Sequence, residues 1–69
     1  MANPRKLGAN IKSLRLQKRI SQEALARAAN LKLSNLAKLE GGFNANPTLI
    51  TLTALARILT GGSIDRLLR

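Results

Sequence analysis

The chain has no cysteine and no histidine, and its only aromatic residue is Phe43. These absences exclude disulfide bridges, thiolate or imidazole metal sites, and nucleophiles or general bases of either type. The three carboxylates, Glu23, Glu40 and Asp65, lie far apart in the sequence, and no glycine-rich phosphate loop accompanies them. We therefore expect neither enzyme activity, nor a metal, nor a cofactor, and no pattern indicates a small-molecule site.

The sequence also lacks a secretory signal core and any apolar run long enough to span a membrane. The absence of cysteine is compatible with a reducing compartment. We therefore expect a cytoplasmic protein that does not interact with membranes.

Acidic residues are scarce, since twelve Lys and Arg against three Asp and Glu give a net charge of +9. Residues 1–40 carry nine of the bases and two of the acids, a net of +7, and residues 41–69 carry a net of +2. A domain this basic is expected to bind a polyanion such as nucleic acid. We expect the binding face on the first three helices.

The 69 residues suffice for one compact domain, 1–69, with a single core. The apolar residues are mainly Leu, Ile and Ala, which favour helices over sheets. The apolar spacing predicts a first helix over residues 5–18, a second from Gln22 to Asn30 capped by Ser21, and a third over 32–40.

Two more helices are expected before the end of the chain. Thr48 or Asn46 opens a fourth helix that ends at the Gly61-Gly62 pair, and Ser63 caps a short fifth helix. The fourth helix is expected to present one broad apolar face to the core, made of Leu49, Ile50, Leu52, Leu55, Ala56, Ile58 and Leu59. In the fifth, Ile64, Leu67 and Leu68 are expected to fold back on the core.

Residues 22–41 predict two short helices joined by a tight turn at Asn30, a residue type that tolerates a positive φ. Two helices that cross through so short a turn need apolar residues at fixed inward positions and a small residue where the backbones approach. Ala26 is the small residue, and the inward apolar positions are Leu25, Ala29, Leu31, Leu36 and Leu39. The pattern predicts a helix-turn-helix within a compact, all-α, five-helix bundle.

Motifs over nearly the whole chain match one known family. They are Leu7-Gly8-Ala9-Asn10-Ile11, Leu14-Arg15, Ser21-Gln22-Glu23, Leu25-Ala26, Leu31, Leu36, Leu39-Glu40, Gly42, Asn46-Pro47, Leu49, Leu52, Leu55-Ala56, Leu59, Ser63-Ile64-Asp65 and Leu67-Leu68. With these motifs the chain resembles the Cro and phage-repressor helix-turn-helix family, also called the xenobiotic-response-element type, whose fold is lambda-repressor-like. The resemblance implies a bacterial or phage-encoded, nucleoid-associated transcriptional regulator, such as a repressor or small controller protein.

The resemblance further implies binding of double-stranded DNA as a homodimer on a palindromic operator, with the third helix in the major groove. The residues implied to contact bases are Lys32, Leu33, Ser34 and Lys38. Lysine can donate to guanine, serine can donate or accept, and leucine can touch a thymine methyl. The residues implied to contact phosphate are Gln22, Asn35, Gly41 and Asn44.

The resemblance also implies a structural ion pair between Arg15 and Glu40, which would join the first helix to the end of the third. One departure from the family pattern concerns the start of the third helix, where Lys32 replaces the usual Ser or Thr. We expect that helix to lack a side-chain cap.

Two other classes of function compete with operator binding. Similar domains serve as protein-interaction modules of antitoxins and coactivators, which predicts only non-specific DNA affinity and a tight protein partner. A cationic membrane-active helix would need continuous amphipathicity and aromatic anchors, and this sequence has neither. The sequence leaves open whether a dimer forms through the end that carries Leu67 and Leu68.

Overall fold

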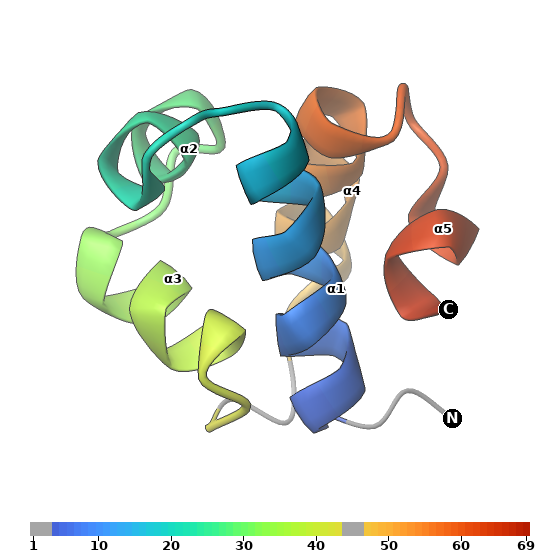
Figure 1. Cartoon of the computed structure of the whole chain (residues 1–69), viewed down its shortest axis with the longest axis horizontal. Coiled ribbons are helices and arrows are strands. Elements are labelled where there is room, and N and C mark those ends of the chain that lie inside the picture. Colours follow the sequence, from blue (N-terminus) through green and yellow to red (C-terminus); the bar gives the residue numbers. More distant parts are fainter. Residues whose placement is uncertain (1–3, 44–46) are drawn as a thin grey trace.

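In the computed structural model, residues 4–43 and 47–69 are described, and they form five α-helices and no strand. The helices are α1 (Pro4–Gln17), α2 (Gln22–Ala28), α3 (Leu33–Glu40), α4 (Leu49–Leu59) and α5 (Ile64–Leu68). Figure 1 shows α1 at the centre, with α2 and α3 on one side of it, α5 on the other and α4 behind. The predicted all-α fold, with a helix-turn-helix made by α2 and α3, is confirmed.

Local capping and turn residues, which can be recognised in the sequence, set the ends of the helices. Ser21 caps α2, since its hydroxyl accepts from the Ala24 amide at 3.0 Å. Asn30 takes a φ of +56° in the turn that follows α2. Lys32 occupies the N-cap of α3 without a side-chain hydrogen bond, as expected from its lack of a hydroxyl.

Every helix contributes at least one residue to the core. Its buried apolar residues are Leu7, Ile11, Leu25, Ala26, Ala29, Leu36, Leu39, Leu55, Ala56, Leu59 and Leu67. The Cα radius of gyration is 10.3 Å. Because α1 packs against α3, α4 and α5, it holds these three helices in place relative to one another.

Three residues expected in the core lie at the surface instead. In α4, Leu49 is 70% exposed and Ile50 is 83% exposed, while Leu55, Ala56 and Leu59 are buried. A single core can cover only one side of a helix, and α4 is apolar on more than one side. In α5, Leu67 is fully buried, whereas Leu68 is 37% exposed.

Candidate nucleic-acid interface

A buried polar network holds α3 in place. Arg15 donates from Nε to Glu40 Oε2 at 2.8 Å and from Nη2 to Glu40 Oε1 at 3.1 Å. The side chains are 9% and 3% exposed, so the paired charges are removed from water. Arg15 Nη1 also donates to the Ile20 carbonyl at 2.9 Å, which ties the turn after α1 into the same network. The structure thus brings together the two residues expected to pair, across the contact between α1 and α3.

Gln22 completes this network from the start of α2. Its Nε2 donates to Glu40 Oε1 at 3.0 Å, and the residue is only partly exposed. One carboxylate therefore receives hydrogen bonds from α1 and from α2 while it sits at the last residue of α3. Hydrogen bonds to a charged group are stronger than neutral ones, so the network fixes the relative positions of three helices.

Gly8 allows α1 to lie directly on the end of α3. A Cβ at this position would overlap the Leu39 carbonyl oxygen and would lie 2.8 Å from the Glu40 carbonyl oxygen. Both neighbours are backbone atoms, which cannot swing aside as a long side chain can. The contact therefore requires glycine for its close approach.

The outer face of α3 is open to solvent. Lys32, Leu33, Ser34, Asn35 and Lys38 are all exposed, whereas Leu36 and Leu39 on the opposite face are buried. The four expected base-reading residues thus lie on or next to one exposed helix. Together they offer two cationic donors, a hydroxyl and an apolar surface, which are the groups needed to read base edges in a major groove.

The expected phosphate-contacting residues are in different situations. Asn35 is exposed on α3, and Gln22 shares its amide with Glu40. Gly41 is exposed, but its N–H already donates to the Ala37 carbonyl at 3.0 Å, so a phosphate would have to share that donor. Asn44 lies outside the described residues.

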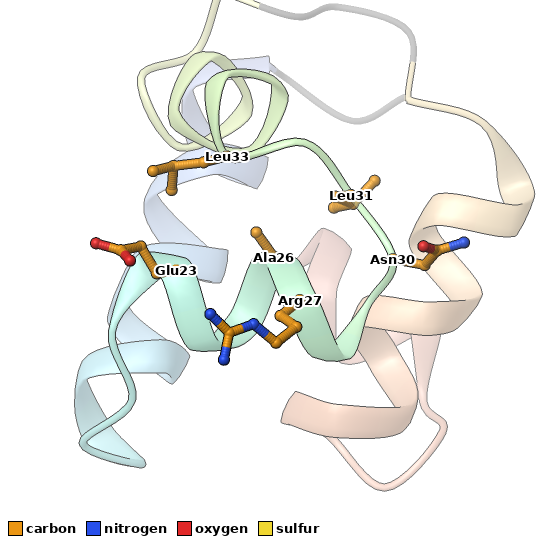
Figure 2. Close-up of a pocket in the computed structure, with 6 residues that line it drawn as sticks. All are labelled: Glu23, Ala26, Arg27, Asn30, Leu31 and Leu33. Carbon is orange, nitrogen blue, oxygen red and sulfur yellow. The ribbon is translucent and has the colours of Figure 1, made fainter.

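A cleft of about 420 Å³ lies between α2 and the start of α3. Figure 2 shows Ala26 and Leu31 pointing into the space between the two helices, while Glu23 lies on the same side as Leu33. The charged residues Glu23 and Arg27 also line this cleft, and the sequence analysis gave neither of them as a site residue. Their spacing of four residues on the exposed face of α2 was the available signal.

The charge of the molecule lies mostly outside the helix-turn-helix. Residues 21–43 carry three bases and two acids, a net of +1, whereas residues 4–20 carry six bases and no acid. The first three helices do hold most of the charge, as expected, but α1 and the turn after it supply nearly all of it. The basic residues that would attract a polyanion therefore lie mostly in a different part of the chain from the residues that could read bases.

None of the described helices is long and apolar enough to cross a membrane.

A family model for helix-turn-helix proteins matches residues 11–67. No curated protein matches the chain.

Three solved structures share the fold of this chain. The restriction-modification controller protein C.AhdI from Aeromonas hydrophila is 31% identical, with a TM-score of 0.85 over 93% of this chain and 94% of that one. The hypothetical transcription factor NHTF from Neisseria is 28% identical, with a TM-score of 0.86 over 97% of this chain and 75% of that one. The clp gene regulator ClgR from C. glutamicum is 26% identical, with a TM-score of 0.83 over 99% of this chain and 86% of that one.

Proposed function

The chain belongs to the Cro/C1-type helix-turn-helix family of DNA-binding transcriptional regulators, and we propose that it reads a specific operator by placing α3 in the major groove. The observation that carries this proposal is the pairing of an exposed polar face on α3 with a buried network at its end. A helix that reads bases must be held rigidly, because displaced donors lose their hydrogen bonds to base edges.

The proposed DNA contacts divide into residues that read bases and residues that contact phosphates. Lys32, Ser34 and Lys38 carry side-chain donors and contact bases, and Leu33 packs on a thymine methyl. Asn35, Gln22 and Gly41 contact the phosphates that flank the site and set the register of the helix. Because Gln22 also bonds Glu40, a phosphate contact at Gln22 joins the DNA backbone to the buried network.

The residues 1–69 act as one DNA-binding domain, in the bacterial cytoplasm and on the nucleoid. Two copies bind a palindromic operator whose half-sites lie about one helical turn apart. C.AhdI is a restriction-modification controller and ClgR is a gene regulator. A repressor or small controller role fits this chain, since its alignment with C.AhdI covers 93% of this chain and 94% of that one.

The test measures the affinity of wild type, Ser34→Ala and Lys38→Ala for a selected duplex site and for single-base variants of that site, by fluorescence anisotropy. Lys38→Ala should weaken binding by about 1–3 kcal/mol and relax discrimination at one base pair. Lys12→Ala, a charge-matched control on α1, should weaken all sequences alike. Equal losses on every sequence for Lys38→Ala would contradict base reading and favour a protein-interaction module.

Salt dependence separates the two kinds of contact. Each neutralised phosphate contributes about 0.9 to the slope of log affinity against log salt. Lys12→Ala should reduce the slope by about one if α1 lies along the backbone. A slope near zero for wild type would contradict an electrostatic contribution altogether.

A further inference from the structure

Phe43, the only aromatic residue of the chain, lies at the surface shortly after the end of α3. Its exposed fraction is 84%. Its backbone is held by a hydrogen bond, because its N–H donates to the Lys38 carbonyl at 2.9 Å. Gly42, which precedes it, takes a φ of +79° in this turn. Phe43 is thus an exposed aromatic side chain on a hydrogen-bonded turn.

The ring of Phe43 occupies the place of a side chain that α3 lacks. Gly41 is the C-cap residue of α3, and a Cβ at this position would lie 2.8 Å from Cδ2 and from Cε2 of the Phe43 ring. The ring therefore covers the spot that a side chain at position 41 would fill. Gly41 has an αR backbone with a φ of −79°, so the turn itself does not require glycine there. The missing Cβ makes room for the ring.

Position 41 belongs to the same face of α3 as two of the expected base-reading residues. Residues four and seven apart lie on one side of an α-helix, and Ser34, Lys38 and Gly41 have this spacing. Ser34 and Lys38 are both exposed. The Phe43 ring therefore adds an apolar group to the end of the exposed polar face of α3.

Basic residues lie on both sides of this turn. Lys38 accepts the Phe43 N–H through its carbonyl, and a Cβ at Gly42 would lie 3.1 Å from Cα and from Cγ of Arg5. Figure 1 shows the same arrangement, with the turn after α3 beside the first turn of α1. An apolar ring next to basic residues matches a DNA backbone, in which sugars alternate with phosphates.

We propose that Phe43, packed against Gly41, contacts a deoxyribose of the operator backbone at the edge of the major groove, an inference that rests on the proposed placement of α3. The N-terminal residues of a recognition helix lie nearest the base edges. Phe43 lies at the other end of α3, where sugar and phosphate form the wall of the groove. The ring has no hydrogen-bonding group, so it suits the C–H surface of the sugar. It anchors the end of α3 without reading sequence.

A thymine methyl is the other apolar group that DNA presents in the major groove. Position 41 is seven residues beyond Ser34, which is about 10 Å along the helix axis at a rise of 1.5 Å per residue. The ring is therefore displaced from the end of α3 that is nearest the bases. A contact with a methyl depends on the DNA sequence, whereas a contact with a sugar does not.

The first experiment compares Phe43→Ala with Ile50→Ala on a duplex that carries one half-site, and on single-base variants of it, by fluorescence anisotropy. Ile50 is 83% exposed on α4, so it controls for loss of an equally exposed apolar side chain. Phe43→Ala should weaken binding by about three- to tenfold, since the ring buries only part of its surface on DNA. The loss should be the same on every variant. The slope of log affinity against log salt should not change, because no phosphate contact is removed.

Two outcomes of this experiment would place the ring on a methyl group and overturn the proposal. One is a loss confined to a single base pair, and the other is a loss that disappears when uracil replaces thymine in the duplex. No loss for Phe43→Ala, or an equal loss for Ile50→Ala, would also overturn it.

The second experiment uses Gly41→Ala to displace the ring. The αR backbone accepts alanine, so circular dichroism should show a folded domain, while the new Cβ pushes the ring aside. Gly41→Ala should lose affinity by about the same factor as Phe43→Ala, and the double variant should lose no more than either. Losses that multiply in the double variant would show that Gly41 acts independently of the ring and would overturn the proposal.

The third experiment uses the absence of tryptophan and tyrosine from the chain. Phe43→Trp introduces a single fluorophore, whose emission should be quenched by duplex DNA at low salt, whereas the emission of Ile50→Trp should change little. If wild type shows no sequence preference, the proposed function fails, and the contact is judged by this experiment, which needs no operator. Unchanged emission of Phe43→Trp at saturating duplex, or equal quenching of Ile50→Trp, would overturn the proposal whatever DNA the chain prefers.

Discussion

The contact between α1 and α3 and the outer face of α4 are built from similar sequence patterns and end in opposite states. Along α1, the apolar residues Leu7 and Ile11 are buried. The contact with α3 includes the close approach at Gly8 and the ion pair between Arg15 and Glu40. Along α4, Leu49 and Ile50 are apolar and remain in water. The first surface fixes the position of α3 within the chain, and the second leaves apolar side chains exposed to solvent.

Apolar periodicity therefore identifies a helix but does not indicate how much of its surface the core will cover. At the α1 contact, Gly8 and Arg15 admit one arrangement only, because a Cβ would collide with backbone and an unpaired charge would be buried. On α4, Ile50 is 83% exposed. The predictions below test whether the two surfaces differ in this way.

The largest effect is expected from Arg15→Ala, which leaves the buried Glu40 carboxylate without its cation. Loss of one partner of a buried ion pair costs about 3–5 kcal/mol, a large part of the stability of a domain of this size. Urea unfolding followed by circular dichroism measures it. The double variant Arg15→Met/Glu40→Leu should recover most of the loss, and a change below about 1 kcal/mol for Arg15→Ala would contradict a structural role.

A second comparison sets one leucine of α4 against another. Leu55→Ala, on the buried side, should cost about 2–5 kcal/mol because it opens a cavity. Leu49→Ala, on the exposed side, should stay within about 0.5 kcal/mol in a dilute sample. Similar losses of unfolding free energy for the two variants would show that the outer face of α4 is needed by the single chain.

Gly8→Ala tests the close approach of α1 to α3. Overpacking against the Leu39 and Glu40 carbonyls should destabilise the fold by about 1–3 kcal/mol. Helix propensity alone would act in the opposite direction, since alanine is favoured over glycine by about 1 kcal/mol. Ala9→Gly, at the exposed neighbouring position, should show the propensity term alone, so a gain in thermal stability for Gly8→Ala would contradict the contact.

The smallest effect concerns the missing cap of α3. Lys32→Ser should add a hydrogen bond to the first turn and raise the unfolding free energy by up to about 1 kcal/mol. Ser21→Ala should lower it by about the same amount, because the bond from the Ala24 amide is lost. Lys32→Ser should also weaken operator binding, and a variant that gains stability without losing affinity would remove Lys32 from the reading face.

Much of the fold could be predicted from the sequence, because its signals are local. Ser21 indicates where α2 begins, because its hydroxyl caps the helix, and Asn30 indicates where the chain turns, because it tolerates a positive φ. Both effects act over a few residues. The five-helix order follows from such signals together with apolar spacing.

What the sequence could not supply depends on contacts between distant segments. Gln22 was expected to contact phosphate, and no local pattern indicated that its Nε2 donates to Glu40, eighteen residues away. The exposure of Leu49 and Ile50 depends on which side of α4 packs against the other helices, and the apolar spacing within α4 does not indicate that side.

Operator reading by α3 can be tested by selecting bound duplexes from a random library, with wild type and with Lys38→Ala in parallel. We predict a motif with two symmetric halves for wild type, and for Lys38→Ala the same motif with one base pair of each half relaxed. Recovery of no motif by wild type, or an unaltered motif for Lys38→Ala, would contradict operator reading by α3.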